Sequence, residues 1–131
     1  VTSRLGGEVT RTGIEPDEEA SIRAFVQEAV ASSCDLVLTT GGTGFAPRDR
    51  TPEAVARLLD RRAENLMELA RLRCKEITPF TYLSRGVSGT IGATLVVTLP
   101  GSPRGACETL EAMIDLIPHA IDALRSEEDH A

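Results

Sequence analysis

The chain has 131 residues, of which 41% are hydrophobic and 26% are charged, so we expect a single globular domain over residues 1–131 with a core of its own. Its net charge of −6, its lack of Trp and its four other aromatic residues argue against a nucleic-acid partner, because such proteins use basic residues to bind phosphates and aromatic rings to stack on bases. No apolar run approaches the roughly 20 residues that cross a bilayer, and no signal peptide is visible, so we expect no membrane partner.

The first elements of the chain are predicted from its turn residues and its apolar spacing. Residues 1–7 resemble the end of a helix with a glycine C-cap. The β-prone run 8–14 predicts a strand. Pro16 then opens a helix in which Asp17 is expected as the N-cap. Apolar residues recur in this helix at positions i, i+3, i+4, i+7 and i+8, a spacing that places them on one face. They are Ile22, Phe25, Val26, Ala29 and Val30.

The stretch 35–51 carries the most information in the sequence. Residues 36–38 are apolar and too few for a helix, which favours a buried strand of a parallel sheet. A glycine loop, residues 41–44, follows this strand. Thr51 is predicted to cap the next helix, with Pro52 at its first position. A glycine loop at the carboxyl end of a parallel strand is where open α/β sheets bind ligands.

The loop favours an anionic ligand, because closely approaching backbone N–H groups bind phosphate. It matches neither common template: no Gly-Lys-Ser/Thr ending is present, and Pro47 stands where a dinucleotide-binding loop needs glycine. Asp49 lies beside it, between Arg48 and Arg50, and could hold Mg²⁺, while Arg48 could bind phosphate. A plain turn with solvated charges is the alternative for the whole stretch.

The second half of the chain predicts a second junction of the same kind. The helix from Thr51 should be followed by another that presents an apolar face from Leu66 to Cys74. Residues 81–84 are predicted to form a strand, residues 85–92 a turn and hairpin, and residues 94–99 a buried strand. This last strand runs into Pro100 and Gly101, with Ser102 as the cap of a final helix and Pro103 at its first position, and Pro118 is expected to kink that helix. The two strand–glycine–helix junctions should face one crevice.

The three cysteines, Cys34, Cys74 and Cys107, are odd in number and widely spaced. This excludes a disulfide framework and a zinc site of known spacing. We therefore expect reduced thiols in a cytoplasmic protein.

The motif residues together carry a family resemblance. In chain order, the motifs are I-E-P-D-E at 14–18, T-T-G-G-T-G-F-A-P-R-D with T-P-E-A at 39–54, L-S-R at 83–85, G-T-I-G at 89–92 and T-L-V-V-T-L-P-G-S-P at 94–103. They resemble the motifs of the molybdopterin adenylyltransferase family and occur in the same order as in that family. That family includes MogA, MoaB and the G domains of Cnx proteins and gephyrin. The resemblance implies a three-layer α/β/α sandwich with a mainly parallel sheet. The family usually starts with a strand carrying Ser-Asp, so this chain is expected to be truncated, lacking that strand and most of the first helix.

The resemblance also implies an activity: Mg²⁺-dependent transfer of AMP from ATP to molybdopterin, giving adenylyl-molybdopterin. Asp17 and Asp49 are the catalytic carboxylates that it implies, with Asp49 holding the metal. The substrate-binding residues expected from the motifs are Thr40, Gly41, Gly42, Thr43, Gly44, Arg48, Ser84, Gly89, Pro100, Gly101 and Ser102.

Assembly and alternatives follow from the same resemblance. Family members form trimers, some of which pair into hexamers, so a homotrimer is expected. Its first candidate interfaces are the helix over 66–74 and the stripe that ends at Ile121 and Leu124. Two alternatives stay open: a module that binds molybdopterin without catalysis, and a gephyrin-like scaffold.

Overall fold

A four-stranded sheet lies at the centre of the computed structural model, which describes residues 2–129, with side chains over residues 4–126. The strand order is β1-β4-β3-β2, with bounds β1 (Leu36–Thr40), β2 (Arg61–Arg62), β3 (Ser88–Ile91) and β4 (Thr94–Leu99). β1 pairs with β4 in parallel, whereas β3 pairs antiparallel with both β4 and β2. The sheet is therefore mixed, where the sequence predicted a mainly parallel one.

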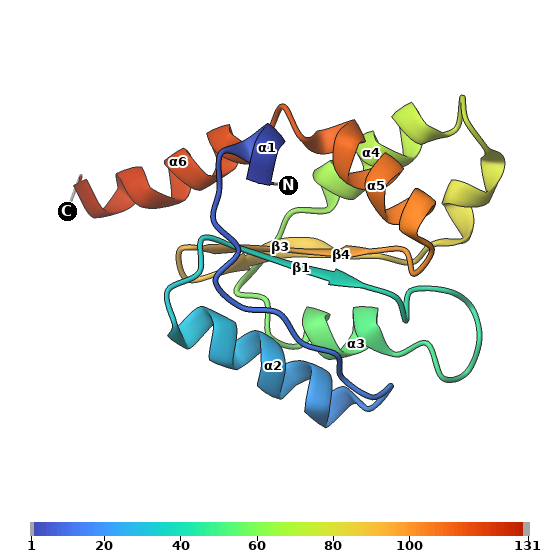
Figure 1. Ribbon diagram of the computed structural model, residues 1–131, viewed down its shortest axis with the longest axis horizontal. Helices are drawn as coiled ribbons and strands as arrows, with labels where there is room; N and C mark the ends of the chain where they lie inside the picture. Colours follow the sequence, from blue (N-terminus) through green and yellow to red (C-terminus); the bar gives the residue numbers. More distant parts are fainter. Residues whose placement is uncertain (1, 130–131) are drawn as a thin grey trace.

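Helices cover both faces of this sheet, which confirms the three-layer α/β/α fold (Figure 1). Two helices lie on one face, α2 (Glu19–Ala31) and α3 (Thr51–Ala56). The other face carries α4 (Glu64–Cys74), α5 (Pro103–Met113) and α6 (Ile117–Asp129), with α1 (Thr2–Leu5) beside them. A 3₁₀ helix, η1 (Pro79–Leu83), follows α4. None of the helices within the described part of the chain is both long enough and apolar enough to span a membrane.

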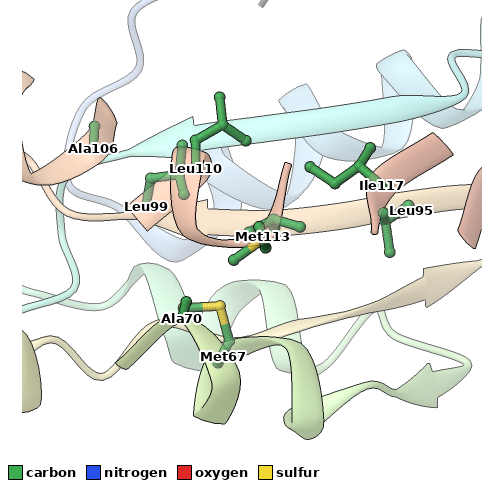
Figure 2. Packing of buried hydrophobic residues seen from close by; sticks show 9 residues of the cluster. Met67, Ala70, Leu95, Leu99, Ala106, Leu110, Met113 and Ile117 are labelled. Carbon is green, nitrogen blue, oxygen red and sulfur yellow. The ribbon is translucent and has the colours of Figure 1, made fainter. Parts of the chain in front are cut away.

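β4 is the centre of the core, because it lies between β1 and β3 and all six of its residues are buried. Its side chains alternate between the two faces of the sheet. Leu95 and Leu99 pack with Met113 and Ile117 in the cluster beneath α4, α5 and α6 (Figure 2). Val96 joins the separate cluster that α2 and α3 form on the opposite face.

The strand predicted over residues 8–14 does not form. This segment has no strand partner within residues 2–129 and is exposed throughout. Even the apolar side chain of Ile14 is 99% exposed. β-prone residues form a strand only when a neighbouring strand takes up their N–H and C=O groups. Within the described residues, α2 therefore follows an irregular segment instead of the predicted strand.

Two other predicted elements differ in type. Residues 81–84 fall at the end of η1 instead of forming a strand, since Pro79 opens a tight turn that Thr78 caps by accepting the Phe80 N–H at 3.2 Å. The expected kinked C-terminal helix is two helices, because α5 ends at Met113. Pro118 stands in the first turn of α6, where a missing N–H costs nothing.

The predicted helix caps are right at one position and wrong at two. Ser102 caps α5 by accepting the Gly105 N–H at 3.0 Å, with Pro103 as the first helical residue, as predicted. α2 begins at Glu19, so Asp17 lies outside its cap position and makes no capping bond. Thr51 is the first residue of α3 instead of its cap, and its N–H donates to the Gly42 carbonyl at 3.2 Å.

A matched pair of leucines tests the place of the core. Leu95→Ala should lower the free energy of unfolding by about 2–5 kcal/mol, because it removes a side chain that is 1% exposed and leaves a cavity. Leu72→Ala, at a site that is 51% exposed on α4, should change it by less than about 0.5 kcal/mol. Urea unfolding of both variants decides the matter. Equal losses would contradict the assignment of β4 to the centre of the core.

Candidate functional site

The two predicted glycine junctions lie against each other at the carboxyl ends of the parallel strands β1 and β4. The Gly41 N–H donates to the Leu99 carbonyl at 3.0 Å. A Cβ atom added at Gly101 would lie 3.2 Å from the Gly41 Cα, so the two backbones meet without a side chain between them. The two loops lie side by side as expected, but they line two different cavities instead of one crevice.

Gly42 folds the loop back onto α3. Its φ of +67° is in the left-handed region, and a Cβ atom there would lie only 2.2 Å from the Thr51 Oγ1 atom. Both facts require glycine, whatever the loop binds. The glycine that the sequence assigned to ligand approach therefore also has a structural role.

Arg85 holds the glycine loop in its conformation through hydrogen bonds. Its backbone N–H donates to the Thr43 carbonyl at 2.7 Å, and its Nε donates to the Gly44 carbonyl at 2.8 Å. Its Nη2 donates to the Asp49 carbonyl at 2.7 Å, and its Nη1 donates to the Glu53 carboxylate at 2.6 Å. One side chain thus spans the loop from its glycines to the first turn of α3. Sequence reasoning missed this role, and its only signal was the position of the arginine directly after Ser84.

The contact with Arg85 also changes the pKa of the Glu53 carboxyl group. The hydrogen bond from the guanidinium lowers the pKa of Glu53, and this effect outweighs the partial burial that would raise it. The carboxylate therefore stays charged in the folded protein at pH values where a free glutamate takes up a proton.

Thr43 and Ser84 are brought together from segments far apart in the sequence. Thr43 is 3% exposed, and the Ser84 Oγ donates to its Oγ1 at 3.1 Å. Arg71 of α4 donates to the carbonyls of Ser84 and Gly86 at 2.9 and 3.0 Å, which holds this segment under the loop. The two hydroxyls bond each other, so they support the loop from beneath.

Asp49 has a structural role that the sequence did not reveal. Its Oδ2 accepts the Ala46 N–H at 3.0 Å, and its own N–H donates to the Ala46 carbonyl at 2.9 Å. No cluster of three potential metal-ligating side chains occurs within the described residues. Mg²⁺ is usually held by one or two carboxylates together with substrate phosphates and water. Asp49, whose Oδ1 accepts no hydrogen bond from another described residue, fits that kind of ligation.

Seven of the predicted site residues border one of two cavities. The larger, of about 800 Å³, is lined in part by Asp17, Thr40, Gly41 and Gly42. The smaller, of about 390 Å³, is lined in part by Ser84, Pro100 and Ser102. The Gly41–Gly101 contact lies where these two groups of residues meet.

Six predicted site residues line neither cavity: Thr43, Gly44, Arg48, Asp49, Gly89 and Gly101. Gly89 is buried within β3, where a Cβ atom would lie 2.3 Å from the Arg61 carbonyl oxygen, so its glycine serves the packing of the sheet. Arg48 is exposed on the loop and lines neither cavity. Asp17 is also exposed, in the turn that precedes α2.

Comparison with known families identifies the fold. A family profile described as a probable molybdopterin binding domain matches residues 1–119. The chain belongs to this family. Gephyrin from Dictyostelium discoideum is 42% identical to this chain over 120 residues, which cover 91% of the chain and 17% of gephyrin.

Two further relatives are shorter proteins. The molybdopterin adenylyltransferase of Escherichia coli K12 is 42% identical over 105 residues, covering 79% of this domain and 54% of the enzyme. The molybdopterin biosynthesis enzyme MoaB from Thermus thermophilus superimposes with a TM-score of 0.86 at 48% identity, covering 93% of this chain and 79% of that one. The chain thus spans little more than half of the E. coli enzyme and a small part of gephyrin. The predicted family and the α/β fold are confirmed.

The Arg85–Glu53 pair predicts a pH dependence of stability. Because the folded pKa of Glu53 is lowered, its contribution is complete above the unfolded value of about 4.3 and is lost as the pH falls through the folded value. Glu53→Gln should therefore destabilise the protein at pH 7 and progressively less below about pH 4.3.

Urea unfolding of wild type and variant across this range measures the effect. Glu68→Gln, an exposed position on α4, is the control and should leave stability unchanged at every pH. A Glu53→Gln deficit that stays constant down to the most acidic sample would contradict the lowered pKa.

Proposed function

We propose that this domain acts in molybdenum cofactor synthesis by transferring AMP from ATP to molybdopterin. The observation that carries the proposal is the glycine loop, held rigid by Arg85 beside Asp49, in a chain that is 42% identical to a molybdopterin adenylyltransferase. Such a loop suits a nucleotidyl transfer, which depends on positioned N–H groups and charges more than on a protein nucleophile.

The reaction requires little covalent chemistry from the protein itself. A terminal phosphate oxygen of molybdopterin forms a bond to the α-phosphorus of ATP, and the bond from that phosphorus to the bridging oxygen breaks, so that pyrophosphate leaves. Loop N–H groups of residues 42–44 would hold phosphate oxygens, since the Gly41 N–H already donates to Leu99, and Arg48 would pair with others at the rim. Asp49 would hold Mg²⁺ together with substrate phosphates, and the bound ion would neutralise their charge. Asp17 would supply the second carboxylate.

Two substrates match two cavities, one on each side of the paired glycine loops. The cavity beside Asp17, Thr40 and Gly41 and the cavity beside Ser84, Pro100 and Ser102 would each take one substrate. The two reacting phosphates would come together at the loops, which contact each other at Gly41 and Gly101.

One observation favours a second candidate, a domain that binds molybdopterin without catalysis. The hydrogen bond from the Ala46 N–H explains the presence of Asp49 by the geometry of the loop alone. An aspartate with that role would stand here even in a non-catalytic domain or a gephyrin-like scaffold. Removing its charge while keeping this hydrogen bond separates the two candidates.

Asp49→Asn is that substitution, because an amide oxygen can still accept the Ala46 N–H. AMP transfer should fall by at least about 100-fold, as expected when a group that stabilises transferring phosphate is lost. The melting temperature should stay close to that of wild type. Asp115→Asn, which affects only an exposed ion pair with Arg73, is the control and should retain full activity.

Turnover of ATP with molybdopterin and thermal melting provide both readouts. Activity of Asp49→Asn within a few-fold of wild type would refute the metal role, whereas a wild type that binds molybdopterin without transferring AMP would favour the binding-only domain.

We propose that the domain assembles as a homotrimer through a different surface from the faces predicted. Leu66 and the stripe ending at Ile121 and Leu124 pack on the domain's own core. The exposed large apolar side chains instead concentrate on one surface, the η1 surface, formed by the end of α4 and by η1 with the segment between them. Its members are Leu72, Ile77, Phe80, Tyr82 and Leu83. Exposed apolar side chains gathered on neighbouring segments are typical of subunit contacts.

Phe80→Asp tests this assembly, because Phe80 is 73% exposed and a charge there would be buried without a partner in the interface. Light scattering of the wild type should give about three times the 14.0 kDa of one chain, and the variant should give the monomer mass. Val9→Asp, at another exposed apolar site, is the control and should leave the mass unchanged. A trimeric Phe80→Asp would place the interface elsewhere, and a monomeric wild type would refute the trimer.

The cytoplasm is the location that we propose. Cys34, Cys74 and Cys107 are all free thiols. Burial raises the pKa of the Cys74 thiol, which keeps it protonated and unreactive. Thiols in this state fit a reducing compartment.

A further inference from the structure

Glu19, the first residue of α2, is contacted by three arginines from two parts of the chain. Its Oε2 accepts a hydrogen bond from the Arg50 Nη2 at 3.2 Å. Its Oε1 lies 3.0 Å from the Arg57 Nη1 and 3.7 Å from the Arg23 Nη1. Three positive groups thus surround one carboxylate.

The carboxylate is the least exposed member of this Glu19 cluster. The Glu19 side chain is 23% exposed, against 45% for Arg50 and 62% for Arg57. Its Oε1 is buried and accepts no hydrogen bond from another described residue, so guanidinium charge alone balances it. A desolvated carboxylate of this kind depends on its partners, and they depend on it to offset their mutual repulsion.

The cluster connects the two segments that carry the proposed catalytic carboxylates. Asp17 stands two residues before Glu19, in the exposed turn that leads into α2. Arg50 directly follows Asp49, whose side chain closes the turn on Ala46. The Glu19–Arg50 contact is therefore a direct polar link between the start of α2 and the end of the glycine loop.

We infer that Glu19 is a positioning residue, which sets the separation of Asp17 and Asp49 without touching substrate. The inference rests on the proposed AMP transfer. Neither aspartate belongs to a helix or a strand, so each takes its place from the element that follows it, α2 or α3. The Glu19 cluster joins those two elements, through Arg50 directly before α3 and Arg57 directly after it. A small displacement of catalytic groups costs far more in turnover than in binding.

Loss of the Glu19 charge has a further consequence. Without it, Arg23, Arg50 and Arg57 would be left without their shared counter-ion close to the loop that binds phosphate. They would attract ATP in its ground state as strongly as in the wild type or more so, while the carboxylates lose their spacing. The expected signature is a fall in kcat with a KM for ATP that is unchanged or lower.

Glu19→Gln is the test, because it removes the charge and keeps the shape. We expect kcat for AMP transfer to fall at least about tenfold, with KM for ATP unchanged or lower. Glu19→Asp, which keeps the charge, should recover part of the loss. Glu28→Gln is the matched control on the same helix, since Glu28 forms only an exposed ion pair with Arg11 at 3.2 Å, and it should behave as wild type.

A double-mutant cycle tests whether Glu19 acts through Arg50. If Glu19 acts through Arg50, then Glu19→Gln combined with Arg50→Gln should lower kcat little more than either change alone. Effects that multiply would assign Glu19 a role independent of Arg50 and overturn the inference, as would a Glu19→Gln kcat within twofold of wild type.

Hydrogen exchange gives a readout that does not depend on activity. Glu19→Gln should speed amide exchange in residues 15–18 and 45–50, and Glu28→Gln should not. An inactive wild type with this exchange pattern would refute the proposed AMP transfer and leave the link between the segments standing. An active wild type whose Glu19→Gln variant keeps full kcat and unchanged exchange would refute the positioning role alone.

Discussion

The guanidinium group of Arg85 connects the parts of the site that no secondary-structure element holds. It donates to the Gly44 and Asp49 carbonyls and pairs with Glu53, so that the glycine loop, the turn at Asp49 and the first turn of α3 form one unit. A loop rich in glycine has a large conformational entropy to lose when it orders around a ligand. Arg85 offsets much of that loss in the free protein, so the loop is already ordered without a ligand.

The parallel pairing of β1 with β4 supplies the other half of the arrangement. Thr40 lies opposite Leu99, so both strands end at the same level and their following glycines, Gly41 and Gly101, come into contact. A shift of one residue in this register would move the loops apart and turn Val96 and Val97 to the wrong faces. The buried clusters on both faces of β4 prevent that shift, so core packing and site geometry depend on the same strand.

Local sequence determined the elements whose physical cause is local. Residues 36–38 and 95–97 are continuous apolar runs with β-branched members, and both lie in strands. Ser102 and Pro103 start a helix because a hydroxyl cap and a fixed φ act within one turn. The glycine motif indicated the family and placed a loop at a strand end. Residues 8–14 failed because strand formation needs a partner that their own composition does not supply.

Only the tertiary structure decided which side chains work together. Arg85 meets Gly44 across 41 residues of sequence, Ser84 meets Thr43 across the same separation, and Arg50 meets Glu19 across 31. No spacing rule reaches so far, because these contacts follow from the order of strands in the sheet. Asp49 was found as a candidate from its neighbours, yet its bond to Ala46 depends on how the loop folds. The sequence by itself determined what kind of loop this is, and the packing of distant segments determined its shape, since a glycine-rich chain has no preferred shape until other residues hold it.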